Sequence, residues 1–365
     1  MALAFGAAIG SFLNVVIYRM PRGLSLSNPK HSFCPKCKNR LLMSDMIPLI
    51  TWLIQRGRCK YCDAKIPSRY FWVELLNGAI WSGIWWQYLI VGDDWVKALC
   101  YAFAASTLVA IIFIDWELYI IPDQINAFLL FLGLAYNAWL YAQGSSAAMT
   151  WGIPSSVAGA LVGVGVLWGI AFLGRVLFGK DAMGHGDIKM ARGIGAILFP
   201  ALAVTSFALA VGLGAILGVA QVFLRPRSES EAASEAEPVK ILEEPSPSAS
   251  IQESTQENRE QSGGIPDPSS QEEESYVPES IGSLLKCGLG YILCIDVIGL
   301  FIPKLYKAWF NEDPYEPIED LETFEADFTM IPFGPYLALG AIVGTVFEKQ
   351  LLTAVRSYWN WAAGE

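Results

Sequence analysis

The feature that most constrains this chain is a series of long stretches that contain no charged residue. Several reach about 17 residues or more, close to the ~20 apolar residues with which an α-helix crosses a bilayer. The bilayer interior offers the backbone no hydrogen-bonding partner, so segments of this kind form helices. Only 16% of the residues are charged and 53% are hydrophobic, which excludes an ordinary aqueous enzyme and a simple secreted domain. The predicted fold class is an all-α polytopic membrane protein.

The distribution of charge predicts the orientation of these helices. Between Arg19 and Arg69 the chain carries 11 Lys or Arg against two acidic residues, and such an excess belongs on the cytoplasmic side. Residues 1–18 have no basic start and no cleavage site, so they are predicted to be a retained span and not a signal peptide. The amino terminus is therefore expected outside. No sustained basic stripe is present, and no nucleic-acid partner is expected.

The uncharged runs also set the number of spans. The run Gly193–Leu224 is too long for one crossing at ~1.5 Å per residue, and basic residues at both of its ends predict a helical hairpin. Its turn is expected near Pro200 to Thr205. With this hairpin the chain has about eight predicted transmembrane helices, the others lying at residues 1–18, Tyr70–Val91, Ala98–Ile114, Ile125–Tyr141, Ile153–Leu173 and Phe333–Phe347.

A disordered acidic insertion is predicted after the hairpin. Residues 228–280 hold 14 Asp or Glu against two Lys or Arg and are rich in Ser and Pro, a composition that cannot bury enough apolar surface to fold. The apolar stretch Ile281–Pro303 is interrupted by Lys286 and Asp296, so we expect an interfacial or bundle-packed helix there and not a span. The predicted parts are thus a first span (1–18), a cytoplasmic loop domain (19–69), a set of spans (70–225), the disordered insertion (226–280), an apolar helix with an acidic segment (281–328), and a last span with a tail (329–365).

Four cysteines in the cytoplasmic loop form the first chemical motif. Cys34 and Cys37 are followed, after 21 intervening residues, by Cys59 and Cys62. Two Cys-x-x-Cys pairs on a short polar loop supply four thiolates, the ligand set of a structural tetrahedral zinc site that leaves no open position for catalysis. The alternative is four reduced thiols, since a cytoplasmic location disfavours disulfides. The other three cysteines lie in apolar segments and are predicted to be packing residues.

Two aspartates at the predicted cytoplasmic ends of spans form the second motif. Asp115 directly follows an apolar run, and Asp187 lies in the sequence Gly184-His185-Gly186-Asp187. If the two carboxyl groups meet, they share one proton and can activate a water against a peptide carbonyl, as in aspartic proteases. The glycines would let an extended substrate backbone approach closely. The alternative is a pair of solvated carboxylates at helix ends.

Other polar residues near these motifs have simpler predicted roles. Asp123, after Pro122, is expected to be the N-cap of the next helix. His185 is expected to be a polar turn residue, and Lys189 either sets the electrostatics beside Asp187 or extends to the interface.

Several ordered motifs together resemble one family, the bacterial type IV prepilin leader peptidases, which are membrane aspartic proteases of the Gly-x-Gly-Asp type. The resemblance covers roughly residues 5–225 and 329–348. It rests on Gly10-Ser11-Phe12-Leu13-Asn14, the four cysteines, Arg69-Tyr70 with Val73-Glu74-Leu75-Leu76, the Asp115 region, Gly184-x-Gly186-Asp187-x-Lys189 and Ile331-Pro332-Phe333-Gly334-Pro335.

The resemblance implies a bifunctional enzyme of the bacterial inner membrane. Asp115 and Asp187 would be the proteolytic pair, with Gly184, Gly186 and Lys189 in the active-site loop. They would remove a short basic leader from prepilins or type II secretion pseudopilins at the cytoplasmic face. The zinc-bearing loop would serve N-methylation of the new amino terminus by S-adenosylmethionine, whose binding residues the sequence leaves unassigned. Glu74, near the start of a span, belongs either to this methylation site or to an ion pair with Arg69.

Three classes of function agree with these motifs to different degrees. A membrane aspartic endopeptidase needs both Asp115 and Asp187, which the chain carries. A membrane methyltransferase without proteolysis would not need them, and a noncatalytic zinc-stabilised pilus or secretion assembly factor would need only the cysteine loop. The presence of both aspartates with their flanking glycines favours the endopeptidase.

Overall fold

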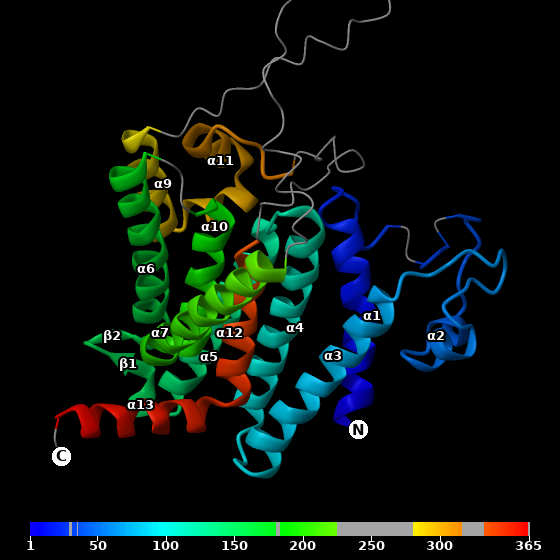
Figure 1. The fold of residues 1–365 in the computed structure, drawn as a ribbon, viewed down its shortest axis with the longest axis horizontal. Coiled ribbons are helices and arrows are strands. Elements are labelled where there is room, and N and C mark those ends of the chain that lie inside the picture. The colour runs from blue at the N-terminus through cyan, green and yellow to red at the C-terminus, as the bar shows by residue number, and fades with distance from the viewer. Residues whose placement is uncertain (29–30, 35, 180–182, 225–279, 316–331, 364–365) are drawn as a thin grey trace, which may run out of the picture. The chain divides into compact units, whose positions relative to one another are not determined.

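The computed structural model describes residues 1–28, 31–34, 36–179, 183–224, 280–315 and 332–363. Helices make up nearly all of the regular structure in these ranges, which confirms the all-α fold class (Figure 1). The elements are α1 (Ala2–Arg19), η1 (Met43–Met46), α2 (Ile50–Ile54), α3 (Arg69–Ile84), the π-helical η2 (Trp85–Ile90), α4 (Trp95–Leu118), α5 (Asp123–Ala142), η3 (Ser146–Ala148), the two-stranded hairpin β1 (Met149–Thr150) and β2 (Ile153–Pro154), α6 (Ser155–Phe178), α7 (His185–Leu224), α9 (Ile281–Ile292), α10 (Ile295–Phe301), α11 (Pro303–Phe310), α12 (Gly334–Val346) and α13 (Glu348–Ala363).

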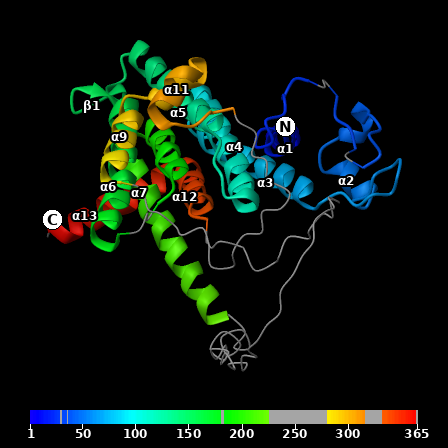
Figure 2. The same ribbon diagram turned by 90° about the horizontal axis from the view of Figure 1, so that it is seen from above.

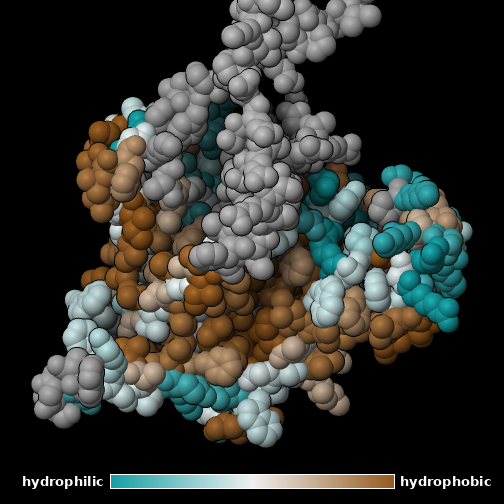
Figure 3. All heavy atoms as spheres, in the orientation of Figure 1, coloured by the Kyte–Doolittle hydropathy of each residue, from teal (hydrophilic) through white to brown (hydrophobic). Residues whose placement is uncertain are grey.

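Five of the described helices are long and apolar enough to cross a membrane: α1, α4, α5, α6 and α7. Two bent pairs, α9 with α10 at 70° and α12 with α13 at 93°, raise the number to seven if each pair is counted as one span. Large apolar side chains are exposed along these helices, among them Phe131, Leu161 and Leu173. Hydrophobic residues accordingly cover much of the bundle face in Figure 3, whereas hydrophilic residues gather on the loop after α1. The chain is a multi-pass membrane protein.

Helix α4 lies at the centre of the bundle. Its small residues, such as Ala102 and Ala105, are fully buried and let α1, α3, α5 and α12 pack against it. Helix α1 crosses α3 closely, because a side chain at Gly10 would lie 2.8 Å from the Cα of Glu74. This packing places the last turn of α4, which carries Asp115, inside the bundle.

The long uncharged run forms a single broken element, α7. The break is at Phe199, whose backbone is non-helical (φ 61°, ψ 170°), and Pro200 follows it. Proline cannot donate the helical hydrogen bond, so the two helical segments separate there and run in different directions in Figure 1. The break lies just before the turn predicted near Pro200 to Thr205.

The predicted acidic insertion and the acidic segment after residue 315 lie almost wholly outside the described residues. The apolar stretch between them forms α9 and α10, and α11 follows. Helix α9 lies beside α6 (Figure 1, Figure 2), and α10 contacts α5. Asp296, which interrupts the apolar run, is buried, so this segment packs on the bundle. The predicted tail after the last span contains a further helix, α13, which the sequence analysis missed.

Candidate active site

Asp115 lies in the last turn of α4, where the helix is about to end. Tyr119 follows α4 in a left-handed conformation (φ 56°, ψ 31°), which stops the helix and turns the chain toward α5. The Asp115 side chain is buried, and its carboxylate accepts a hydrogen bond from the backbone N–H of Gly334 at the start of α12. Two segments far apart in sequence therefore hold this carboxylate in place.

Asp187 lies in the first turn of α7. The helix begins at His185, so Gly184 is the N-cap and Asp187 occupies the third helical position. The Asp187 carboxylate accepts a hydrogen bond from the backbone N–H of Gly184, as the third residue of a capping box does. Its Oδ1 atom is buried and has no partner within the described part of the chain. One carboxylate oxygen thus fixes the helix start, and the other remains available to water or substrate.

The structure brings the two aspartates together. Both line one cleft of about 510 Å³, and they are close enough to interact electrostatically. Gly184, Gly186 and Lys189, the other predicted residues of this site, line the same cleft. The alternative of separate solvated carboxylates at helix ends does not describe this arrangement.

Gly334 determines how closely α12 approaches the first aspartate. A Cβ atom at this position would collide with the Asp115 carboxylate and would lie 3.0 Å from Cδ1 of Ile121. Ile121 also packs against Gly186, because a Cβ atom added to Gly186 would lie 3.1 Å from the Cβ of Ile121. The glycine at 186 therefore allows close packing of the α4–α5 connection, and not only the substrate approach that the sequence suggested.

The predicted roles of Asp123, Lys189 and His185 need correction. Pro122 is the N-cap of α5, and both carboxylate oxygens of Asp123 accept hydrogen bonds from Lys189 Nζ at 2.8 Å. Lys189 is buried in this ion pair and does not extend to an interface. His185 Nδ1 lies 2.8 Å from the hydroxyl of Tyr291 in α9, so it is more than a turn residue. These partners were not foreseen because they lie 66 and 106 residues away in the sequence.

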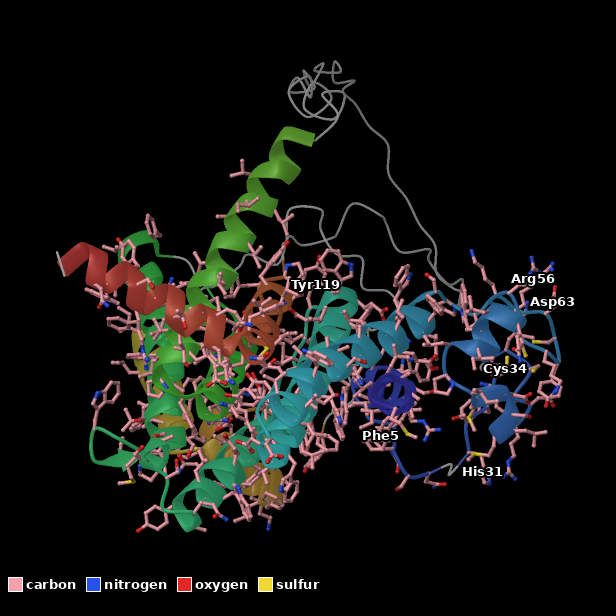
Figure 4. The ribbon with its side chains drawn as sticks, turned by 90° about the horizontal axis from the view of Figure 1, so that it is seen from below. Phe5, His31, Cys34, Arg56, Asp63 and Tyr119 are labelled. Carbon is pink, nitrogen blue, oxygen red and sulfur yellow. The ribbon has the colours of Figure 1, made fainter. Side chains whose placement is uncertain are left out.

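The four loop cysteines form a compact cluster. Their sulfur atoms lie within 4.8 Å of one another, and Cys34 Sγ and Cys62 Sγ are 3.8 Å apart. Zinc–sulfur bonds of about 2.3 Å in a tetrahedron place sulfur atoms about 3.8 Å apart, so the cluster fits a zinc ion. Figure 4 labels Cys34 in this loop and Tyr119 at the end of α4, in separate parts of the protein.

The two Cys-x-x-Cys segments are structural repeats of each other. Cys34 N–H donates to the carbonyl of Asn39, and Cys59 N–H donates to the carbonyl of Ala64. Lys38 and Asp63 occupy equivalent left-handed positions, both with φ 57°. This repeat, at an offset of 25 residues, was missed because outside the cysteines the two segments share little sequence.

The pKa values of the cluster thiols differ strongly from one cysteine to another. Burial raises the pKa of the Cys34 thiol, but the hydrogen bonds from the backbone N–H groups of Cys37 and Lys36 lower the pKa by more than burial raises it. The result is a pKa of about 7, below the usual value for a thiol. The Ala64 N–H lowers the pKa of Cys62, whereas burial and hydrogen bonds with the other three cysteines raise it to about 12. Four thiolates this close repel one another unless a cation neutralises them. The donor set therefore suits a bound metal cation.

Comparisons with known proteins identify the family of this chain. Residues 4–88 match the model of the bacterial peptidase A24 N-terminal domain, and residues 102–219 match that of the type IV leader peptidase family. A prepilin leader peptidase/N-methyltransferase of Aeromonas hydrophila is 34% identical over 255 residues, which cover 63% of this chain and 83% of that protein. The chain belongs to the type IV leader peptidase family. A relative of the same name from Neisseria gonorrhoeae is 33% identical over 221 residues, 54% of this chain and 73% of the relative. No solved structure gives a significant match.

This type IV leader peptidase family member has a second cavity beside the cysteine cluster. It measures about 620 Å³ and lies between the loop and the start of α3, lined among others by Asn14, Trp52 and Glu74. Asn14 Oδ1 and Trp52 Nε1 are buried there without a partner within the described residues. Buried polar atoms of this kind are rare unless a ligand or water satisfies them.

Glu74 does not form the expected ion pair with Arg69. Its carboxylate accepts a hydrogen bond of 2.7 Å from the backbone N–H of Leu49 in the loop, and Arg69 pairs with Glu117 instead. Glu74 is therefore a contact between the loop and α3 and a buried acid of the second cavity. The predicted ion pair with Arg69 is therefore wrong, and the predicted place in a methylation site stays a prediction.

Proposed function

We propose that this protein cleaves the leader peptide from type IV prepilins or type II secretion pseudopilins and then methylates the new amino terminus. The observation that carries the proposal is the meeting of Asp115 and Asp187 in one cleft. Membership of the type IV leader peptidase family and relatives named prepilin leader peptidase/N-methyltransferase support it. A protein that only methylated would have no use for the pair.

The two carboxyl groups act as an acid–base pair. Two negative charges in one cleft repel each other, so the pair carries one proton between its two carboxyl groups. The ionised carboxylate takes a proton from a bound water as the water attacks the scissile carbonyl, and the protonated carboxyl donates its proton to the carbonyl oxygen. Collapse of the tetrahedral intermediate returns a proton to the departing amine. The free Oδ1 of Asp187 suits the water-binding role.

The experiment that tests cleavage uses the purified full-length protein and a prepilin in detergent or vesicles. Loss of the leader gives a product whose mass and first residue are both measured. A shorter product that begins at the mature residue supports the peptidase. A product that gains only the mass of a methyl group, with its leader intact, would leave a methyltransferase and remove the peptidase.

The second cavity is the proposed site of the methyl donor, S-adenosylmethionine. Its volume of about 620 Å³ lies in the range of small-molecule sites. Asn14 and Trp52 offer unpaired polar atoms to a ligand, and the Glu74 carboxylate suits the donor's positive charge or the proton of the accepting amine. The donor supplies the methyl group, and these residues bind and orient it.

The two cavities lie on either side of the end of α1. Tyr18 and Arg19 line the methyl-donor cavity, whereas Met20 and Pro21 line the cleft with the aspartates. A new amino terminus produced in the cleft has only to pass this turn to reach the second cavity. Titration of S-adenosylmethionine against the protein, followed by calorimetry, tests the site: Glu74→Gln should weaken binding at least tenfold.

The zinc ion is proposed to be structural and to be held by Cys34, Cys37, Cys59 and Cys62. Asp45 supports the loop around it, because its carboxylate accepts hydrogen bonds from Tyr61 and Lys60, which follow Cys59. The Tyr61 hydroxyl, with help from the Lys60 ammonium, holds the pKa of Asp45 below its usual range. We place both sites at the cytoplasmic face of the bacterial inner membrane, with the amino terminus outside.

A further inference from the structure

The helices α9, α10 and α11 lie outside both regions that match the family models. They are short, with 12, seven and eight residues, and they gather at the end of the bundle where α6 ends and α7 begins (Figure 1). We name these three helices, residues 281–310, the clamp. Each of them contacts the first two turns of α7, the helix that carries Asp187.

The contacts involve three polar side chains of α7. His185 Nδ1 lies 2.8 Å from the Tyr291 hydroxyl of α9. Lys189 Nζ donates to the Tyr306 hydroxyl of α11 at 3.1 Å. The Arg192 guanidinium donates to both carboxylate oxygens of Asp296 in α10, at 2.8 and 2.5 Å.

The spacing of these side chains explains the arrangement. Residues 185, 189 and 192 are separated by four and three positions, so they fall on one face of α7. Asp187 is two positions after His185, about 200° around a helix with 3.6 residues per turn, and points the other way. The clamp therefore holds the face of α7 that carries residues 185, 189 and 192, while Asp187 projects from another face of the helix. His185, Lys189 and Tyr306 of the clamp line the same cleft as Asp187, so the clamp forms part of the wall of the cleft.

The contact at Lys189 is the most developed of the three. Its ammonium lies 5.5 to 5.6 Å from the ring centres of Tyr291, Tyr306 and Phe310, within cation–π range. The Tyr306 hydroxyl also donates to Asp123 Oδ2 at 2.6 Å. Tyr306 thus joins the start of α5 to α7. A short connection leads from α5 back to α4, which carries Asp115.

The contact at Arg192 is the most deeply buried. The Arg192 and Asp296 side chains are each 2% exposed, and Arg192 also donates to the backbone carbonyl of Tyr291 at 2.8 Å. A buried bidentate pair fixes orientation more strictly than a contact between apolar side chains, because the planar groups must match. It sets the rotation of α7 against the clamp, and therefore the direction of Asp187.

We propose that the clamp is a positioning element of the peptidase site, with Tyr306 and Asp296 as its positioning residues, acting on Asp187 through Lys189 and Arg192. Tyr306 lines the cleft, but it is 3% exposed and its hydroxyl is bonded to Lys189 and Asp123, so we assign it a positioning role and not a catalytic one. The proposal deepens the proposed peptidase function and rests on it. Displacement of a reacting group by about 1 Å can lower a rate by about a hundredfold.

The test compares Tyr306→Phe with Tyr88→Phe. Tyr88 belongs to a similar group elsewhere in the protein. Its hydroxyl lies 2.8 Å from the backbone carbonyl of Thr345 and 3.0 Å from Glu348 Oε2, which pairs with Lys97, and Lys97 lies 5.1 Å from the Tyr88 ring centre. Both changes remove one buried hydroxyl from a lysine–carboxylate–tyrosine group. For Tyr306→Phe we expect kcat for prepilin cleavage to fall about tenfold or more with KM within about twofold, whereas Tyr88→Phe keeps the wild-type kcat.

Hydrogen exchange supplies a readout that does not depend on activity. Backbone amides of residues 185–192 should exchange faster in Tyr306→Phe than in wild type and remain unchanged in Tyr88→Phe. Wild-type kcat and exchange in Tyr306→Phe would overturn the proposal, as would equal losses in both variants that follow their thermal stabilities. If wild-type protein cleaves no prepilin, the proposed function fails, and the exchange comparison still decides whether the clamp fixes the start of α7.

Discussion

At the scale of single residues, the site depends on two aspartates that each use one backbone N–H group for orientation. Gly334 supplies the donor for Asp115, and Gly184 supplies it for Asp187. Both donors come from residues next to a helix start, where N–H groups lack partners within the helix. The carboxylates are therefore positioned by the ends of α12 and α7, and substitutions at these four positions should affect cleavage more than substitutions elsewhere in the bundle.

The first prediction concerns the aspartates themselves. Asp115→Asn or Asp187→Asn keeps the size of the side chain but removes the titratable carboxyl, so prepilin cleavage should fall to background while the protein still inserts into the membrane. Asp94→Asn is the matched control, because Asp94 caps the far end of α4 by accepting from Lys97 N–H and Asn caps nearly as well. Full cleavage by Asp187→Asn would contradict the mechanism.

The second prediction concerns Gly334. A methyl group at this position meets the Asp115 carboxylate, so Gly334→Ala should displace that carboxylate and lower kcat at least tenfold. Gly165→Ala is the control, since nothing lies within 4 Å of a Cβ there, and an alanine within a helix is slightly stabilising. Equal cleavage rates in the two variants would show that α12 does not approach Asp115 as described.

At the scale of elements, the loop after α1 and the clamp are stabilised by different kinds of interaction. The loop has short helices and isolated bridges but few buried apolar residues, so the metal proposed for the cysteine cluster would stabilise it. The clamp holds α7 through charged and aromatic side chains. A metal-stabilised loop and a polar clamp should respond to different perturbations, which the next two predictions use.

Removal of the metal should affect one activity more than the other. About one zinc per chain is expected to co-purify, and Cys34→Ser or Cys62→Ser should release it and loosen the loop. Methylation should then fall much further than cleavage, because the aspartates lie on α4 and α7. Metal analysis beside both assays gives the measurement; Cys100→Ser, which leaves the cluster intact, is the control. Zinc at full stoichiometry after loss of two cluster cysteines would refute the site.

The buried pair of the clamp should be costly to break. Asp296→Asn leaves the Arg192 charge buried without a counter-charge, a change of about 3 kcal/mol or more. Asp63→Asn is a matched control, because Asp63 pairs with Arg58 with both side chains largely exposed, and such pairs contribute little. Thermal unfolding in detergent should show a clear decrease only for Asp296→Asn; similar midpoints for the two variants would mean that the pair does not anchor the clamp.

At the scale of the whole molecule, the sequence predicted what short motifs and long uncharged runs can encode. The cysteine cluster and the meeting of Asp115 with Asp187 follow from local patterns and from helix ends that face the same side. A bundle-packed helix was among the expectations for residues 281–303, but the contacts of the clamp were not foreseen, because they join residues 99 to 183 positions apart and one sequence gives no such pairing. The polar face of α7 at 185, 189 and 192 was the available signal.

The last prediction concerns the side of the membrane on which these parts lie. If α9 and α10 pack on the bundle without crossing, Glu312 after the clamp stays on the same side as Ser44 in the cysteine loop, the cytoplasmic one. Both residues are exposed, as is Ser146 in the connection before α6, which is expected outside. Single cysteines at these positions, compared with unsubstituted protein, should react with an impermeant maleimide from outside in intact cells only at 146. Reaction at 312 from outside would show that the α9–α10 pair crosses, and Asp115, Gly334 and the clamp could then not share the cleft described.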